Sequence, residues 1–490
     1  MAPTEHVAGA ATAAAPPPPH FVIVPVLARG HIIPLVDLAR LLAGRGARAS
    51  VVTTSLHAAR LRGVAGNAVE LVELPFPPPG SGLPPDCQGI DIIADNTQIL
   101  PFFLALRELA GPLDAYLRAL ARRPSCIVAD WCCPWTAAVA RSLGIPRLFF
   151  HGPSCFFSLC DLNATEHGLH DQIAAGDDQE QHVVPGMPVP VKVSKGTADG
   201  FFNGPGFERL RDEAMEAMRT ADGAVANTFM ELEEQFVACY EAALGKPVWT
   251  VGPLSLANRD GEATASRCRG KMAAADETAI VAWLDEQATD SVVYVSFGSV
   301  AQKLPKQLLE IGHGLEATGK PFLWVVKEAE AAAPEVEEWL QALEVRTAGR
   351  GLVVRGWAPQ LAVLSHRAVG GFVTHCGWSS LLESMAHGVP VVTWPHFVDQ
   401  FLNERLVVEL LGVGVPIGVT APVMLFDDEA VPVVRGDVVR AVSALMGAGV
   451  EADERRKKAK EYGQKAHLAM EKGGSSYKNL TRLIERFMQS

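Results

Sequence analysis

The feature that most constrains the fold is the recurrence of short, apolar, β-rich runs, each followed by a turn and a segment with helical periodicity. Strands that alternate with helices in this way form parallel sheets with helices on both faces, because a parallel connection needs a crossover long enough to hold a helix. The sequence therefore predicts an α/β chain. The predicted strands are His20–Leu27, Ala49–Thr53, Cys126–Ala129, Arg147–Phe150, Ser291–Phe297, Pro321–Val326, Gly351–Arg355, Gly371–Thr374 and Val389–Trp394.

These strands fall into two groups, and a chain of 490 residues is longer than one hydrophobic core usually organises. Between the groups, the segment 253–278 is rich in Gly, Ala, Ser and charged residues, which is typical of a linker. We therefore expect two Rossmann-like domains, at 19–252 and 279–472, that face each other across a cleft. A disordered tail is expected at 1–18 and an amphipathic helix within 473–490.

Composition excludes several classes of partner. With 48% hydrophobic and 20% charged residues the chain is globular, and its net charge of −12 argues against nucleic acid or an anionic membrane as a partner. The cysteines show no spacing suited to zinc, which favours a reducing compartment. No signal peptide and no long apolar stretch is evident. We expect a cytoplasmic monomer without stable membrane insertion.

Two further segments carry many glycines or prolines. The stretch Gln172–Pro205 is rich in Gly, Pro and Asp and predicts mobile loops near the cleft. The spacing in Gly412–Gly418 is similar to that of a dinucleotide-binding loop, but Pro416 and the wrong intervals favour a turn beside a strand.

Polar residues follow four of the predicted strands, where ligands bind in open α/β sheets. His31 follows the first strand, Asp130 ends the run CIVAD, Ser299 ends VVYVSFGS and His375 ends GFVTH. Two of these positions belong to each half of the chain. A cleft that holds two substrates requires this arrangement.

His31 and Asp130 form a candidate general-base pair. Imidazole titrates near neutral pH, and a neighbouring carboxylate orients the ring and stabilises the imidazolium that forms as a proton is taken up. The alternatives are a helix N-terminal His without chemical function and an Asp that only caps the next turn.

A second candidate site is the turn His375–Gly377, between a predicted buried strand and a predicted helix, Trp378–His387. Such a turn leaves the first helical amides unpaired at the positive end of the helix dipole, which attracts phosphate. Ser379 and Ser380 can join those amides, and Glu383 can accept hydroxyls of a sugar. The alternative is an N-capping Ser with a surface Glu.

The stretch from Trp357 to Gln400 resembles the signature box of plant secondary-product UDP-glycosyltransferases, family 1 enzymes with the GT-B fold of two Rossmann-like domains. The resemblance implies a UDP-glucose donor, because a terminal Gln in the box is associated with glucose. Ser379 stands where the family usually has Asn. The implied contacts with UDP-sugar involve Ser299, Trp357 on uracil, Ala358 on the uracil edge, Gln360 and Glu383 on ribose, His375, Gly377, Trp378, Ser379 and Ser380 near the pyrophosphate, and Asp399 and Gln400 on the sugar.

The resemblance extends to the first half of the chain, where the family's catalytic His lies in a Gly-His-x-x-Pro segment, here Gly30–Pro34. It implies that His31 is the general base and Asp130 its partner, in an inverting transfer to a hydroxyl of a flavonoid, triterpenoid, hormone or xenobiotic. Trp131 and His151 are expected in the acceptor pocket. No cofactor is expected besides the donor, and no Asp-x-Asp motif indicates a metal.

Two other functions fit the same residues. A nucleotide-sugar epimerase of GT-B architecture also needs a UDP site and a His, but it needs no apolar acceptor pocket. The other is a protein that binds a nucleotide sugar without reacting it. The His31 and Asp130 pair argues against this non-catalytic function.

Overall fold

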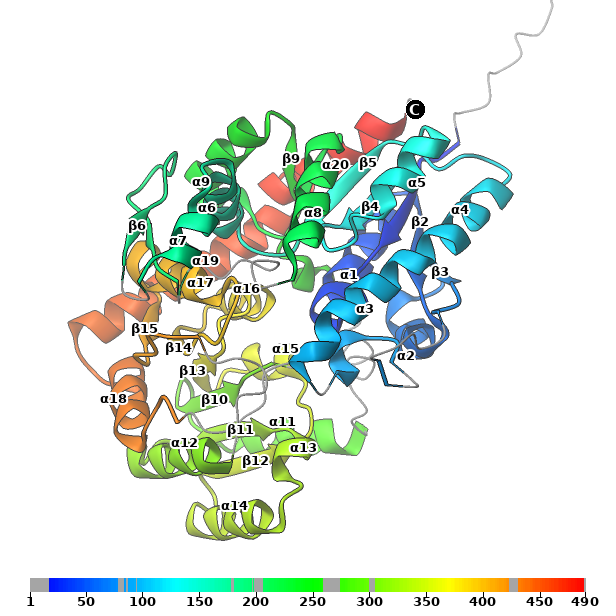
Figure 1. The fold of residues 1–490 in the computed structure, drawn as a ribbon. Helices are drawn as coiled ribbons and strands as arrows, with labels where there is room; N and C mark the ends of the chain where they lie inside the picture. The colour runs from blue at the N-terminus through cyan, green and yellow to red at the C-terminus, as the bar shows by residue number, and fades with distance from the viewer. Residues whose placement is uncertain are drawn as a thin grey trace, which may run out of the picture.

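Two parallel sheets each form the centre of one lobe of the molecule (Figure 1). The GT-B-like α/β architecture predicted from the sequence is confirmed. The computed structural model describes residues 17–77, 83–84, 87–93, 95–177, 180–195, 197, 206–258, 274–298, 305–422 and 431–488.

The first sheet has seven strands in the order β3-β2-β1-β4-β5-β8-β9. All five residues of β1 are buried, as expected for a strand covered on both faces. The strands are β1 His20–Val24, β2 Arg48–Thr53, β3 Val69–Glu73, β4 Cys126–Asp130, β5 Arg147–His151, β8 Gly223–Ala226 and β9 Val248–Thr250. The helices are α1 Arg29–Gly44, α2 Ser55–Ala65, α3 Ile99–Leu106, α4 Ala110–Ala119, α5 Thr136–Leu143, α6 Cys155–Glu166, α7 Leu169–Ala175, α8 Glu208–Thr220 and α9 Met230–Leu244.

The second sheet has six strands in the order β12-β11-β10-β13-β14-β15. The strands are β10 Val292–Ser296, β11 Phe322–Val326, β12 Gly351–Arg355, β13 Val369–Thr374, β14 Val391–Thr393 and β15 Gly414–Pro416. The helices are α11 Ala274–Asp285, α12 Pro305–Thr318, α13 Glu328–Ala331, α14 Pro334–Arg346, α15 Gln360–Leu364, α16 Trp378–Ala386, α17 Gln400–Arg405, α18 Arg435–Met446, α19 Val450–Met470 and α20 Ser475–Met488, with a π-helical turn at Leu406–Leu410.

Two segments predicted as irregular contain some regular structure. Gly412–Gly418, predicted as a turn, contains strand β15, which pairs with β14 at the edge of the second sheet. The predicted loops of Gln172–Pro205 include the end of α7 and an antiparallel hairpin of β6, His182–Val183, with β7, Lys192–Val193. Residues of the same stretch at 178–179, 196 and 198–205 lie outside the described part of the chain.

The boundaries expected for the tail and the linker fall largely on residues outside the description. These are 1–16 of the tail and 259–273 of the linker. At the two ends of the predicted linker, a 3₁₀ helix covers Leu254–Asn258 and α11 begins at Ala274.

The C-terminal helices return to the first lobe, as the red end of the ribbon in Figure 1 shows. Arg45, at the C-cap of α1, stacks on the ring of Tyr477, with 3.5 Å between the guanidinium carbon and the ring centroid. Asn479 of α20 donates hydrogen bonds to the carbonyl (3.2 Å) and the Oγ1 (2.8 Å) of Thr250 at the end of β9. Phe21 of β1 meets Phe487 edge to face, with ring centroids 5.9 Å apart. Helix α20 therefore packs on the first sheet.

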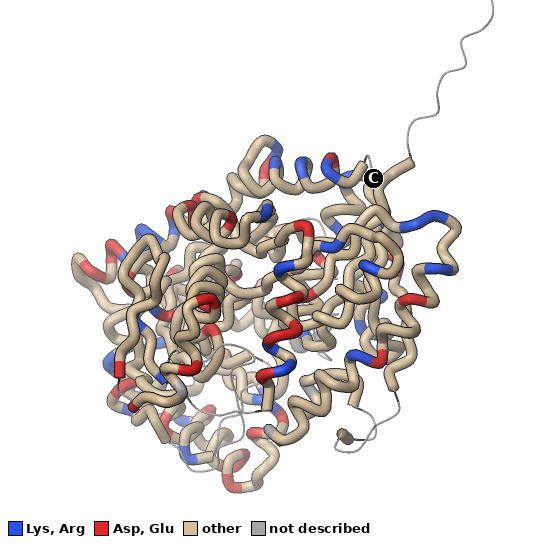
Figure 2. The backbone as a smooth tube through the Cα atoms, turned by 45° about the horizontal axis from the view of Figure 1, so that its top comes forward, with Lys and Arg blue, Asp and Glu red and all other residues tan. Residues whose placement is uncertain are grey.

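The two lobes also share a buried apolar core. The larger cluster of buried residues joins Phe149 of β5, in the first sheet, to Trp378 and Leu381 of α16, in the second lobe. Acidic and basic residues are interspersed over both lobes (Figure 2). Within the described ranges, none of the helices has the length and apolar character needed to cross a bilayer.

Candidate functional site

The order of the first sheet brings His31 and Asp130 together. Strands β1 and β4 are parallel neighbours, with Val24 opposite Ala129, so their carboxyl ends lie at the same edge. Asp130 is the last residue of β4, and His31 lies in the first turn of α1, just after β1. The strand order thus supplies the proximity that the sequence analysis expected of this pair.

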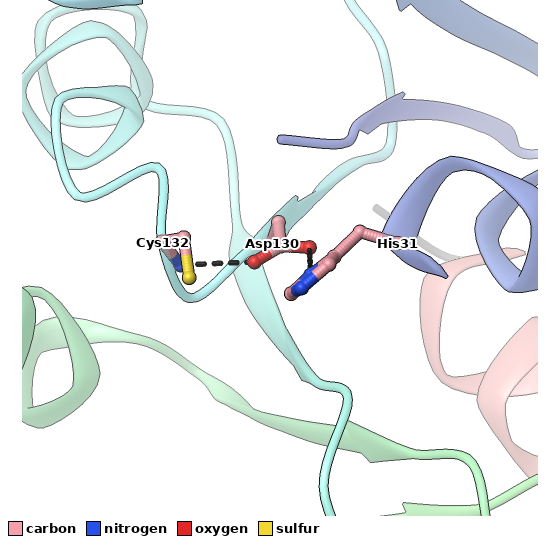
Figure 3. Close-up of side chains that lie close together, drawn as sticks. All are labelled: His31, Asp130 and Cys132. Carbon is pink, nitrogen blue, oxygen red and sulfur yellow. Dashed lines mark hydrogen bonds and ion pairs between the residues drawn. The ribbon is translucent and has the colours of Figure 1, made fainter. Parts of the chain in front are cut away.

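The pair is closely hydrogen-bonded. His31 Nδ1 lies 2.7 Å from Asp130 Oδ2, and the side chains are 21% and 0% exposed. The other carboxylate oxygen accepts a hydrogen bond of 3.0 Å from the amide of Cys132, so both oxygens are fixed (Figure 3). Because Nδ1 is engaged by the carboxylate, Nε2 is the ring atom left to exchange a proton with a substrate.

The spacing of this cluster is close enough for a metal site, because ligand atoms of His31, Asp130 and Cys132 lie within 4.8 Å of one another. Burial, reinforced by the Asp130 charge, raises the pKa of the Cys132 thiol far above its ordinary value. A metal-bound Cys must be deprotonated, and the carboxylate already holds the imidazole. The donor set therefore suits proton transfer better than metal binding.

Trp131 and His151, expected in the acceptor pocket, are buried, at only 6% and 2% exposed. Their rings meet edge to face, with centroids 5.2 Å apart, and the hydroxyl of Tyr240 lies 3.3 Å from His151 Nδ1. Burial lowers the pKa of His151 to about 4, although Asp130 opposes that shift and His31 adds to it. His151 is therefore neutral near pH 7 and supports the site as an uncharged ring.

In the second lobe, β13 ends at Thr374 and α16 begins at Trp378, so residues 375–377 form the turn between them. Cys376 has a φ of +65°, a conformation that is uncommon for a residue with a side chain. Gly377 caps α16 without a side-chain hydrogen bond. The first amides of α16 therefore donate to no capping side chain. Backbone amides at such a helix start suit an anionic ligand.

Two glycines make room for the ring of His375. A Cβ on Gly298 would lie 2.7 Å from His375 Cε1, and a Cβ on Gly377 would lie 2.5 Å from its Nε2. Gly298 also has a φ of +72°, in the region that favours glycine. Ser299, the next residue and a predicted donor contact, lies outside the described residues.

Helices α15 and α16 bring together three of the predicted ribose and phosphate contacts. The side-chain amide of Gln360 donates to Glu383 Oε2 at 2.7 Å and to Ser380 Oγ at 3.2 Å. Tyr294 of β10 donates from its hydroxyl to Gln360 Oε1 at 3.4 Å. These side chains, from β10, α15 and α16, therefore form one hydrogen-bonded polar group.

The remaining residues of the box differ in exposure. Trp357 lies half-buried between β12 and α15, Ala358 beside it is 3% exposed, and Ser379 is half-buried in the first turn of α16. Trp378 is 3% exposed, and its indole N–H donates to the carbonyl of Asn227 at 2.8 Å. Its side chain thus joins the two lobes, and only its backbone belongs to the helix start.

Asp399 and Gln400 follow a strained residue. Val398 has a φ of +58°, which a β-branched residue adopts only where its surroundings enforce it. Gln400 is 5% exposed, and its side-chain oxygen accepts from the amides of His396 (2.8 Å) and Phe397 (3.3 Å). The turn that carries both residues is therefore held in one conformation.

Asp399 lies within electrostatic reach of the other lobe. Burial raises the pKa of its carboxyl to about 6, while a hydrogen bond from Asn403 and the charge of His31 lower it. The charge of His31, the predicted base of the first lobe, thus acts on the carboxyl of Asp399, a predicted sugar contact of the second lobe.

Four residues that bond to the site were not expected from the sequence: Asn227, Tyr294, Cys132 and Asn403. Only Asn403 could have been found from spacing, because it lies four residues after Asp399, on the same face of a helix. The others act through a backbone group or across a long sequence separation, which no local pattern shows.

Comparison with known proteins agrees with this geometry. Residues 20–256 match the family described as "Glycosyltransferase, N-terminal domain", and residues 267–421 match "UDP-glucoronosyl and UDP-glucosyl transferase". UDP-glycosyltransferase 73C3 of Arabidopsis thaliana is 40% identical over 481 residues, which cover 96% of both chains.

Solved structures resemble the chain over nearly its whole length. UGT73P12 of Glycyrrhiza uralensis, in complex with glycyrrhetinic acid 3-O-monoglucuronide, has a TM-score of 0.85 at 34% identity and covers 96% of each chain. UGT71G1 of Medicago truncatula, in complex with UDP-glucose, has a TM-score of 0.79 at 25% identity and covers 96% of this chain and 98% of its own.

Proposed function

The chain belongs to the family of plant UDP-glycosyltransferases, and from this premise we propose that it transfers glucose from UDP-glucose to a hydroxyl of a hydrophobic plant small molecule, with inversion at the anomeric carbon. The observation that carries the proposal is the placement of the bonded pair His31 and Asp130 in one lobe within electrostatic reach of Asp399 in the other. One sugar bound between the lobes would meet both.

In this proposal His31 is the general base. Its Nε2 takes the proton of the acceptor hydroxyl, while Asp130 holds Nδ1 and stabilises the imidazolium. The acceptor oxygen attacks the anomeric carbon as the bond from that carbon to the UDP oxygen breaks. The attack from the opposite face inverts the configuration, and UDP leaves toward the second lobe.

The second lobe would hold the nucleotide. The amides at the start of α16 and the ring of His375 would stabilise the diphosphate charge that develops as UDP leaves, without a metal. Trp357 would stack on uracil next to the Ala358 backbone, and Gln360 with Glu383 would bind ribose. Ser379, Ser380 and Gly377 belong to the same helix start, and Asp399 with Gln400 would accept sugar hydroxyls.

The choice of glucose follows from Gln400 at the end of the box and is supported by the Medicago truncatula relative in complex with UDP-glucose. A flavonoid, triterpenoid, hormone or xenobiotic is the proposed acceptor class, bound on the side of Trp131 and His151. The described cysteines are free thiols, which supports the proposed cytoplasmic location.

The test is incubation of the purified chain with UDP-glucose alone and then with a panel of phenolic and other hydroxylated apolar compounds, followed by mass spectrometry and NMR. We expect UDP release and a β-glucoside only in the presence of an acceptor. An epimerised nucleotide sugar would favour the epimerase, and binding of UDP-glucose without any product across the panel would favour a non-catalytic role.

A further inference from the structure

Asn403, on α17, is a fully buried amide that touches both lobes. Its side-chain nitrogen donates to Asp399 Oδ2 at 2.7 Å and to the carbonyl of Cys376 at 3.0 Å. Its side-chain oxygen accepts from the hydroxyl of Ser154, in the first lobe, at 3.1 Å. Both N–H groups and the oxygen of one amide are thus used in a place without solvent.

These partners fix the orientation of the amide. Asp399 and Cys376 offer only acceptor oxygens, so the nitrogen must face them, and the hydroxyl of Ser154 supplies the donor for the oxygen. A rotated amide would place its oxygen against a carboxylate and a carbonyl at the same time. The observed arrangement is therefore the one that satisfies every group.

The contacts of Asn403 lie at the parts of the molecule that the proposed reaction uses. Cys376 belongs to the turn before α16 and has a φ of +65°, so its carbonyl direction depends on a conformation that needs support. Asp399 is a proposed contact of the donor sugar. Ser154 caps α6 by accepting from the amide of Phe157 at 3.1 Å, and its position is thereby fixed in the first lobe.

We propose that Asn403 is a positioning residue for the donor sugar: its amide orients the Asp399 carboxylate and the turn at Cys376, and Ser154 fixes that unit against the lobe that carries His31. This inference rests on the proposed function, because it assigns the glucosyl group to Asp399. Among the described residues, the hydrogen bonds of Asn403 do not involve Trp357, Gln360 or Glu383, the proposed contacts of uracil and ribose.

Loss of the Asn403 amide should affect the binding of UDP-glucose more than the binding of UDP. UDP lacks the sugar, so its binding does not depend on the Asp399 carboxylate, whereas UDP-glucose binding does. A hydrogen bond to a charged group contributes enough binding free energy that its loss raises a dissociation constant about tenfold or more. The Asn403→Asp variant keeps the size and the acceptor for Ser154 but sets a second carboxylate against Asp399, and Asn403→Ala removes all three bonds.

The experiment is isothermal titration of the full chain and its variants with UDP and with UDP-glucose. We expect Asn403→Asp and Asn403→Ala to weaken UDP-glucose about tenfold or more relative to UDP. The control Asn479→Ala removes another amide with two hydrogen bonds, between α20 and β9, and should leave the ratio of the two dissociation constants unchanged.

Equal losses for UDP and UDP-glucose, or a ratio unchanged from the wild type, would overturn the role of Asn403. Should both Asn403 variants fail to fold, Ser154→Ala provides the test. It removes the hydrogen bond from Ser154 to Asn403 together with the N-cap of α6, but it leaves the bonds of Asn403 within the second lobe in place. It should weaken UDP-glucose about threefold relative to UDP, while a constant ratio would overturn the inference. A wild-type chain that does not bind UDP-glucose would instead overturn the proposed function itself.

Discussion

Replacement of Asp130 by Asn tests the proposed base at the atom that would take the proton. The Cys132 amide donates to Asp130 Oδ1 at 3.0 Å and still requires an acceptor in the variant. The oxygen of the new amide will therefore face Cys132, and its NH₂ will face His31 Nδ1, now 2.7 Å from a carboxylate oxygen. That NH₂ can only donate, so Nδ1 must accept.

The consequence is a change of tautomer. When Nδ1 accepts a hydrogen bond, the proton of neutral His31 lies on Nε2, and that nitrogen can no longer take the proton of the acceptor hydroxyl. A positioned general base contributes about 10²- to 10⁴-fold to the rate, so we expect kcat to fall by about that factor. The corresponding loss of transition-state stabilisation is about 3 to 5 kcal/mol.

The assay is steady-state glucosyl transfer at saturating UDP-glucose, together with titration of the variant with UDP. Because the substitution leaves the second lobe unchanged, the dissociation constant for UDP should match that of the wild type. A loss of turnover smaller than about tenfold, or a loss accompanied by equally weakened UDP binding, would refute the tautomer argument.

Asp37→Asn is the matched control. Asp37 is a buried aspartate, 1% exposed, on the same helix as His31, and it pairs with Arg40 at 3.9 Å. Its replacement perturbs α1 without touching the imidazole. We expect kcat to stay within a few-fold of the wild type, so any larger drop would mean that general damage to α1, and not the tautomer of His31, lowers the rate.

The remaining predictions concern the donor site. Gly298→Ala should weaken UDP binding about tenfold or more in a titration, because its Cβ would lie 2.7 Å from His375 Cε1 at a φ of +72°; unchanged binding would contradict the role of His375. Burial raises the pKa of Asp399 to about 6, so its carboxylate form prevails above that pH and is lost below it. UDP-glucose should therefore bind more weakly relative to UDP as the pH falls from about 8 to about 5, and a constant ratio would contradict the sugar contact. Treatment with EDTA should leave glucosyl transfer unchanged, and its abolition would contradict the assignment of leaving-group stabilisation to α16 and His375.

The strands at the centre of each sheet were predictable, whereas several short or weakly patterned strands away from the centre were not. Central strands such as β1 and β10 are nearly continuous apolar runs. This pattern is typical of a strand that is covered on both faces. In contrast, β8 has only four residues, three of them Gly or Ala with little β propensity, and β9 and β15 are only three residues long. Strand β15 ends in Pro416, which cannot donate a ladder hydrogen bond and is tolerated at the edge of the sheet.

The candidate site likewise contains residues that could be predicted from the sequence and contacts that could not. His31 and Asp130 could be predicted at one edge of the first sheet because His31 follows one predicted strand and Asp130 ends another, and the box from Trp357 to Gln400 is continuous in sequence. The bond between Ser154 and Asn403 joins residues 249 positions apart in different lobes. Such a contact depends on how the lobes pack on each other, which hydrophobic periodicity does not specify.

The central claim is that one UDP-glucose lies between the His31 imidazole and the helix start of α16. The most direct test is a crystal structure of the His31→Ala variant with UDP-glucose bound, since turnover is blocked there. We predict the diphosphate at the start of α16, the glucose against Asp399 and Gln400, and its anomeric carbon facing the space vacated by the imidazole. A nucleotide bound with its sugar directed away from residue 31 would contradict the account.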